Sequence, residues 1–210
     1  MTLRNSFLAL LILSFVAYLV QSNFGNTKVS THTLHSSNNQ YVVYDLYKPK
    51  SASFINKAPF IVVVPGFQRS KEALSNIAIE LSRRGHVVAL IDPYAQGMSS
   101  SSLSRRAATT EGYGMFALID SVHSRDKYNY IDKSRLGSTG HSMGGNAAIR
   151  GANYFGKQAI NNNSDSKLHS VYVSGYVLTL TENVLKNIRS NVGVSYALYD
   201  EGAFRNELKG

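Results

Sequence analysis

The stretch RLGSTGHSMGGNAA, residues 135–148, decides the fold of this chain. Residues 135–139 predict a short strand, and the small residues of 143–154 predict a helix that packs closely against its neighbours. Between them lies Gly140-His141-Ser142-Met143-Gly144, a G-x-S-x-G pattern. In a strand–turn–helix context this pattern predicts a sharp turn that strains the backbone of Ser142, because the flanking glycines leave room for neighbouring backbone. The free N–H groups at the start of the helix would then face any negative charge that develops beside the serine.

Hydrophobic patterns on both sides of this stretch alternate between strands and helices. Spacing of i, i+3, i+4 and i+7 predicts helices, while short runs rich in β-branched residues predict strands buried on both faces. We therefore expect an α/β fold with a mostly parallel, doubly wound sheet and helices on both faces, in one domain over residues 25–210. The expected elements are a hairpin over 29–47 with its turn at 36–39, strands at 59–64, 86–92, 171–180 and 192–199, and helices at 70–84, 115–122 and 181–189.

The N-terminus carries a separate signal. Residues 7–20 read FLALLILSFVAYLV and follow Arg4. Such an apolar run is short for a membrane span of about 20 residues and is typical of a signal-peptide core. It has no polar face, so it does not suit a buried helix of the domain. We interpret residues 1–24 as an apolar helix that is either a cleaved signal peptide or a membrane anchor, with membrane association through residues 6–24, and expect export in both cases.

Composition excludes several classes of function. The 210 residues include 22 Lys and Arg against 13 Asp and Glu, a net charge of +9, but the basic residues are scattered and no nucleic-acid-binding motif is present. The chain has no cysteine, which excludes disulfides and cysteine-ligated metals. No H-E-x-x-H, clustered carboxylate or phosphate-binding glycine loop suggests a metal or nucleotide. We expect neither a nucleic-acid partner nor a cofactor, and the sequence does not indicate an oligomeric state.

Three segments resemble one known family. DKSRLGSTGHSMGGNAA, residues 132–148, is similar to a segment of α/β-hydrolases of the esterase, lipase and serine-aminopeptidase type. Residues 62–92 resemble the strand, oxyanion loop, helix and strand of that family. Residues 92–99 look like its D-x-x-G-x-G-x-S loop, with Ala95 in place of the first glycine. The resemblance implies an α/β-hydrolase fold.

The resemblance also implies roles for single residues. Ser142 would be the nucleophile, in an elbow shaped by Gly140 and Gly144. The backbone N–H groups of Phe67 and Met143 would form the oxyanion hole. Proline at position 65 replaces the family's usual histidine, which leaves the backbone donor of Phe67 intact.

For the acid and the base of the catalytic triad, the sequence matches only part of the family pattern. Asp200 follows the expected last strand and fits the place of the acid, with Glu201 as the alternative. The family's chain order is serine, acid, histidine, yet no histidine occurs between 201 and 210. The histidines that do occur fit structural or exposed positions better than that of a base: His32, His35, His86, His123, His141 and His169. Either the chain is truncated before the catalytic histidine, without the C-terminal strand and helix, or it is complete and inactive. Residues 203–210 resemble the start of a helix, which favours truncation.

These residues predict a serine hydrolase that cleaves small carboxylic esters or related acyl compounds through an acyl-enzyme at Ser142, with little turnover by the 210-residue chain alone. One alternative is a binding protein with the same fold that lacks the base. Another is a membrane-surface protein whose basic face binds anionic lipid.

Overall fold

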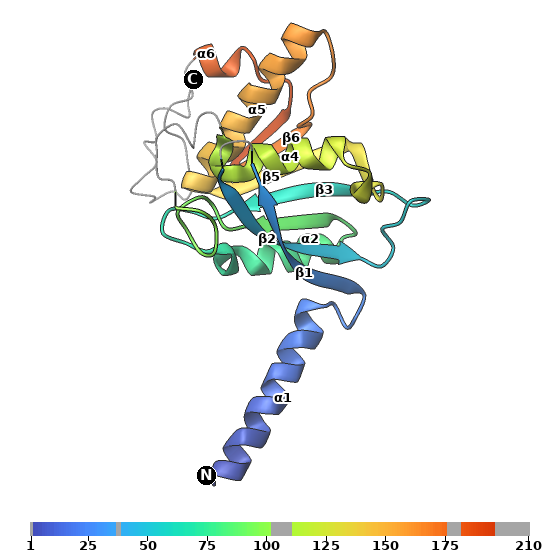
Figure 1. Ribbon diagram of the computed structural model, residues 1–210, viewed down its shortest axis with the longest axis vertical. Helices are drawn as coiled ribbons and strands as arrows, with labels where there is room; N and C mark the ends of the chain where they lie inside the picture. The colour runs from blue at the N-terminus through green and yellow to red at the C-terminus, as the bar shows by residue number, and fades with distance from the viewer. Residues whose placement is uncertain (1, 37–38, 102–110, 176–181, 196–210) are drawn as a thin grey trace.

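The protein folds around one mixed sheet. The computed structural model describes residues 2–36, 39–101, 111–175 and 182–195 (Figure 1). Within these ranges the strand order is β1-β2-β4-β3-β5-β6-β7. The pairs β1–β2 and β2–β4 are antiparallel and all others are parallel, which confirms the mostly parallel sheet. The strands are β1 Thr27–His35, β2 Tyr41–Pro49, β3 Ala58–Val64, β4 Val87–Ile91, β5 Ile131–His141, β6 Ser170–Ser174 and β7 Asn191–Ser195.

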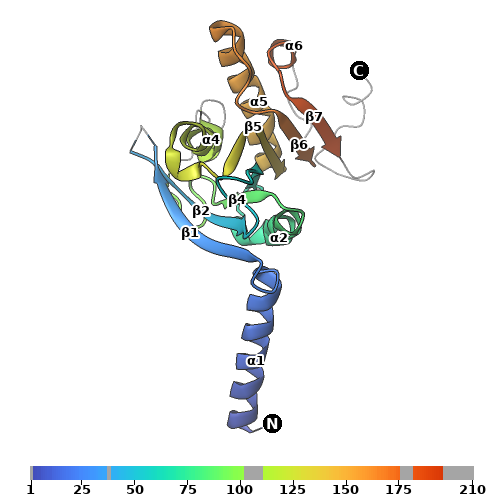
Figure 2. The same ribbon diagram turned by 90° about the vertical axis from the view of Figure 1, so that its right-hand side faces the viewer.

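Helices cover both faces of the sheet, so the doubly wound arrangement is also confirmed. On one face α2 packs on β2 and β4, and on the other face α4 and α5 pack on β3 and β5 (Figure 2). A right-handed crossover places its helix according to the direction in which the chain moves along the sheet. The step from β3 to β4 runs opposite to the later steps, and α2 therefore lies opposite α4 and α5. The helical segments are α1 Leu3–Gln21, η1 Lys71–Leu74, α2 Ser75–Arg83, η2 Gly112–Gly114, α4 Met115–Ser124, η3 Asp126–Tyr128, α5 Met143–Asn162 and α6 Glu182–Leu185.

The short apolar runs of the sequence form the central strands β3 and β4, which are buried inside the domain. Val62, Val63 and Val64 of β3 have no exposed surface, and every residue of β4 is buried. A strand with helices on both sides must be apolar on both sides. Full burial of each such side chain contributes about 1.5–3 kcal/mol. This apolar centre fixes the carboxyl ends of β3, β4 and β5, from which the loops of the candidate site emerge.

Two helices differ in length from the prediction. α5 continues to Asn162, and α6 ends at Leu185, so the expected helix over 181–189 was wrong in extent. The reason is a close contact between the two segments: a Cβ at Gly156 of α5 would lie 2.0 Å from the Asn187 carbonyl oxygen. Asn187 also donates through Nδ2 to Asn153 Oδ1 of α5, at 3.0 Å. Packing of the chain against α5 thus replaces a further helical turn.

The N-terminal helix stands apart from the domain. Both views show α1 projecting away from the sheet (Figures 1 and 2). None of its residues is buried, and its mean hydropathy of 1.9 makes it long and apolar enough to cross a membrane. An N-terminal signal sequence has the same properties, so the prediction of a signal peptide or an anchor stays a prediction. Near the end of α1, Arg83 donates to the Val20 carbonyl oxygen at 3.3 Å.

Candidate active site

Ser142 occupies a strained turn between β5 and α5. It lies directly after His141, the last residue of β5, and its φ of 53° and ψ of −116° are unusual for any residue with a side chain. Its amide donates to the Ser174 carbonyl oxygen at the end of β6, at 2.9 Å, and its own carbonyl oxygen accepts from the Asn146 amide at 3.0 Å. The turn thus places a half-buried serine at the carboxyl edge of the sheet and at the N-terminus of a 20-residue helix.

Two glycines make this turn sterically possible. A Cβ on Gly140 would lie 2.3 Å from the Gly144 carbonyl carbon, so strand and helix meet backbone to backbone. A Cβ on Gly144 would lie 1.9 Å from the Val64 carbonyl oxygen at the end of β3. Backbone atoms cannot rotate away as a side chain can. Any other residue at either position would therefore displace the turn itself.

The loop after β3 lies beside the serine. A Cβ on Gly66 would lie 3.4 Å from Ser142 Cβ, which is ordinary contact distance, so the backbone of this loop borders the serine. The next residue, Phe67, has 55% of its surface exposed. In the described part of the chain, no hydrogen bond takes up the Phe67 amide. Met143 is the first residue of α5, and the amide at such a position has no acceptor within its helix.

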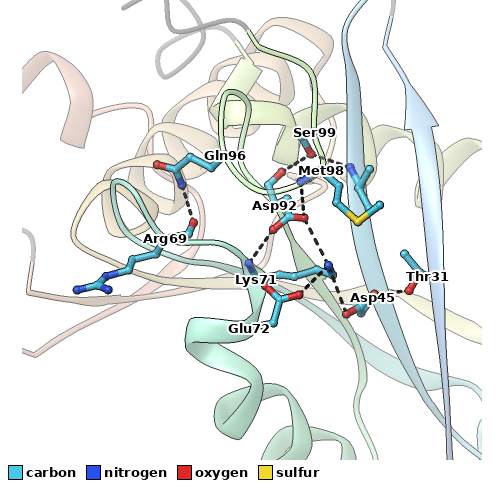
Figure 3. Close-up of polar contacts among 10 residues, drawn as sticks. Thr31, Asp45, Arg69, Lys71, Glu72, Asp92, Gln96, Met98 and Ser99 are labelled. Carbon is cyan, nitrogen blue, oxygen red and sulfur yellow. Dashed lines mark hydrogen bonds and ion pairs between the residues drawn. The ribbon is translucent and has the colours of Figure 1, made fainter.

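A buried carboxylate fixes the far end of this loop. Asp92, which directly follows β4 and has no exposed surface, accepts from the backbone amide of Lys71 at 2.7 Å and from that of Met98 at 3.0 Å (Figure 3). Lys71 Nζ lies 3.5 Å from the same carboxylate and 3.9 Å from Asp45 on β2. Because its oxygens are occupied in this way, Asp92 holds the two loops together.

The charges of this cluster support one another. Burial alone would lower the pKa of Lys71, but the hydrogen bond to Glu72 and the charges of Asp45 and Asp92 outweigh it, so the pKa is raised. Hydrogen bonds from Ser70 and Lys71 lower the pKa of Glu72 to about 2. Lys71 is therefore a buried cation at neutral pH, held by carboxylates from three segments.

The sequence matches a known protein family over most of its length. The profile of the PET hydrolase-like family matches residues 16–200, which include the elbow, the loop after β3 and the whole described sheet. The chain belongs to the PET hydrolase-like family. No curated protein sequence matches this family member significantly.

Solved structures share the fold of this PET hydrolase-like chain at low identity. A dienelactone hydrolase-like promiscuous phosphotriesterase from metagenomic libraries has a TM-score of 0.65 and 15% identity, over 88% of this chain and 74% of its own. A hyperthermophilic esterase from the archaeon Pyrobaculum calidifontis has a TM-score of 0.56 and 18% identity, over 79% and 50%. A thermophilic carboxylesterase cloned from a metagenomic library has a TM-score of 0.57 and 19% identity, over 74% and 49%. The chain spans about half the length of several such structures, from 44% to 50%. Together they confirm the α/β-hydrolase fold.

Apart from His141, which directly precedes Ser142, the histidines of this family member lie on other segments of the chain. Within the described residues, no hydrogen bond joins a histidine ring to the Ser142 hydroxyl. His32 stacks on Tyr44, and His35 contacts Tyr41. His86 Nδ1 lies 3.2 Å from the Leu81 carbonyl oxygen, and His169 Nδ1 accepts from the Leu136 amide at 3.3 Å. Burial, with the charge of Lys167 next, lowers the pKa of His123. Exposed His141 borders Gly66.

The acidic residues considered for the triad differ in whether the structure describes them. Asp200 and Glu201 lie outside the described residues. Asp120, on α4, forms an ion pair with Lys167 on the surface. Among the described residues, no group of three or more His, Cys, Asp or Glu side chains is arranged to hold a metal ion.

A mostly apolar cavity in the described part of the protein does not contain the serine. About 690 Å³ in volume, it lies between α2 and the neighbouring face of β5, β6 and β7. Its walls include Ile77, Thr139, Tyr172 and His141, but neither Ser142 nor Phe67. A second cavity, about 830 Å³ in volume and lined by residues that include Ala159, Asp165 and His169, also lacks both residues.

Proposed function

We propose that this chain carries the nucleophile and the oxyanion hole of a carboxylic ester hydrolase. The observation that carries the proposal is the strained Ser142 at the N-terminus of α5, with the Gly66–Phe67 backbone packed beside it. Strain of this kind is kept where surrounding structure enforces it, often at catalytic residues. The family name refers to PET hydrolases, and several structures of the same fold are esterases. Both support an ester as the substrate class.

The reaction follows from these groups. The Ser142 hydroxyl attacks the ester carbonyl carbon and gives its proton to a base. The carbonyl oxygen becomes an oxyanion, which accepts hydrogen bonds from the amides of Phe67 and Met143. The alcohol leaves with the proton, and water then releases the acid from the acyl-serine. Loss of one oxyanion donor typically costs about 3–4 kcal/mol of transition-state stabilisation.

The base is the remaining requirement. Asp200, or Glu201 in its place, is the proposed acid that would orient a histidine, but none of the six histidines follows it in the 210 residues. We therefore expect little turnover by the 210-residue chain alone. Imidazole added to the solution can take the place of a missing base, because it titrates near neutral pH as the histidine ring does.

A fluorophosphonate probe tests the proposal. We expect covalent labelling of Ser142 whose rate rises with imidazole concentration, measured by mass spectrometry of the intact chain. Ser142→Ala abolishes labelling, whereas Ser138→Ala, which removes a buried hydroxyl from the same strand, leaves it unchanged. Equal labelling of the chain and of Ser142→Ala would refute the nucleophile. Rapid ester hydrolysis without imidazole would show instead that one of the six histidines serves as base.

We also propose that α1 brings the domain to a membrane, either during export as a signal peptide or permanently as an anchor. Its exposed apolar side chains, including Leu10, Ile12 and Phe15, have no partner surface in the described part of the domain. Helix α1 has 19 residues, about 28 Å at 1.5 Å per residue, close to the ~30 Å of a hydrocarbon core.

A further inference from the structure

The side chain of Gln96 binds the backbone on both sides of Phe67. Its Oε1 accepts from the Gln68 amide at 2.6 Å. Its Nε2 donates to the Gly66 carbonyl oxygen at 3.1 Å and to that of Arg69 at 2.8 Å, the latter drawn in Figure 3. The residue is 8% exposed. A carboxamide supplies an acceptor and two donors on one planar group, which is the set that these three backbone groups require.

One of these bonds fixes the direction of the Phe67 amide. The Gly66 carbonyl and the Phe67 N–H belong to the same peptide group, which is planar and trans. In a trans peptide the C=O and the N–H point in opposite directions. Because Gln96 holds the Gly66 carbonyl oxygen toward itself, the Phe67 N–H must point away from Gln96. Without this bond, the peptide plane could rotate through changes in ψ of Gly66 and φ of Phe67.

The loop conformation also needs an external brace. Gln68 has a φ of 56°, in the left-handed region that costs a residue with a side chain about 1–2 kcal/mol. Three hydrogen bonds to a buried carboxamide offset such a cost, since each contributes about 0.5–1.5 kcal/mol. The oxyanion loop therefore depends on Gln96 for a backbone shape that it would not favour by itself.

Gln96 is itself held by its own loop. Its amide donates to the Pro93 carbonyl oxygen at 3.0 Å, and its carbonyl oxygen accepts from the Ser99 amide at 3.2 Å. On its C-terminal side a Cβ at Gly97 would lie 2.2 Å from the Asp92 carboxyl carbon, so that residue packs directly on the buried carboxylate. The carboxamide is thus fixed relative to the end of β4.

We propose that Gln96 is a positioning residue, which fixes the Phe67 amide in the direction needed to stabilise the oxyanion formed at Ser142. The inference rests on the proposed function above. Gln96 touches no reacting atom and acts through the Gly66–Phe67 peptide group. Oxyanion donors are effective because they are in place before charge develops. Loss of the Gln96 hydrogen bonds should therefore lower the rate of reaction at Ser142 in a domain that remains folded.

The test compares Gln96→Leu, Gln96→Glu and Gln40→Leu with the unsubstituted chain. The second-order rate constant for fluorophosphonate labelling of Ser142, at fixed imidazole concentration, is the first readout. We expect Gln96→Leu to lower it by about 10- to 1000-fold, up to the full effect of one lost donor. Gln40→Leu is the matched control, because Gln40 accepts from Ser100 in the same loop but makes no hydrogen bond to residues 66–69 in the described structure, and it should leave the rate unchanged.

The pH dependence of the labelling rate of Gln96→Glu distinguishes a positioning role from a purely structural one. An ionised carboxylate retains the acceptor for the Gln68 amide but repels the carbonyl oxygens of Gly66 and Arg69. Protonation restores one donor. The rate of Gln96→Glu relative to the unsubstituted chain should rise as the pH is lowered from 8 to 5, while the relative rate of Gln96→Leu stays flat. A flat ratio for both variants would overturn the proposal.

A second readout separates this inference from the proposed function. In ¹⁵N-labelled chain, Gln96→Leu should change the chemical shift of the Phe67 amide and speed its hydrogen exchange, with no such change in Gln40→Leu. If the unsubstituted chain is not labelled at Ser142, the proposed function fails, and the Phe67 amide alone decides whether Gln96 orients it. An unchanged Phe67 amide in folded Gln96→Leu, or unchanged labelling, refutes the positioning role.

Discussion

At position 142 the backbone adopts a conformation that glycine tolerates far better than serine. With a φ of 53° and a ψ of −116°, Ser142 lies outside the regions that residues with a Cβ prefer. Such strain costs about 1–3 kcal/mol and persists because the ends of β3, β5 and β6 fix the turn. The turn therefore holds Ser142 in this conformation at the expense of stability.

This strain gives the first prediction. Ser142→Gly should be more stable than Ser142→Ala by about 1 kcal/mol, because relief of the strain exceeds the 0.5–1 kcal/mol that the extra freedom of glycine costs in the unfolded state. Both variants lack the hydroxyl, so the difference isolates the backbone. Urea unfolding followed by circular dichroism measures it. A glycine variant less stable than the alanine variant would show that the turn is not strained.

At the scale of elements, a buried ion cluster joins η1, β2 and the end of β4. Lys71 Nζ lies 3.0 Å from Glu72, 3.5 Å from Asp92 and 3.9 Å from Asp45, and its side chain is only 6% exposed. Removal of one partner from a buried pair leaves a charge without compensation. Asp92 would keep its two backbone N–H bonds, which reduces the penalty but does not replace the cation.

We therefore expect Lys71→Met to lower the free energy of unfolding by about 2–4 kcal/mol, slightly below the usual 3–5 kcal/mol for breaking a buried pair. Asp45→Asn should cost less than about 1 kcal/mol, because Asp45 is more exposed and farther from the ammonium group. Guanidinium or urea titration of each variant provides the comparison. Equal stability of Lys71→Met and the unsubstituted chain would mean that the cluster does not hold these elements together.

At the scale of the whole molecule, the chain consists of a packed domain and a helix that lies outside it. Because no residue of α1 is buried, residues 22–210, which keep the buried Ser22, should have a melting temperature within about 2 °C of that of the full chain. The full chain should sediment with neutral phosphatidylcholine vesicles, and residues 22–210 should not. Residues 22–210 that still bind vesicles rich in anionic lipid would favour the alternative of a basic lipid-binding face.

Much of this architecture could be predicted from local sequence. The runs PFIVVV and HVVALID correspond to β3 and β4 because a strand covered on both faces must be apolar throughout. The prediction for α6 was wrong in extent, since close packing of Asn187 on α5 outweighs its helical pattern. Strand β5 begins at Ile131 rather than at residue 135, and helix α5 ends at Asn162 rather than at residue 154. Contacts with residues distant in the sequence therefore help to decide where a helix or strand ends.

The residues of the candidate site also differ in whether the local sequence is enough to identify them. Gly140, Ser142 and Gly144 could be identified from five consecutive residues, whereas Gln96 and Lys71 were not singled out. Gln96 acts on a loop 27 to 30 positions earlier in the chain, and Lys71 pairs with Asp92 21 positions away. The only signal for Gln96 was its place within the Asp92–Ser99 loop that resembled the family pattern.

The sequence by itself determined the elbow, the alternation of strands and helices and the exposed N-terminal helix, since each depends on steric limits or apolar periodicity among near neighbours. Only the tertiary structure decided which backbone borders the serine and which side chains brace it. The physical reason is that hydrogen bonds and ion pairs between loops depend on where the buried strands end in space. That placement is set by the packed sheet as a whole.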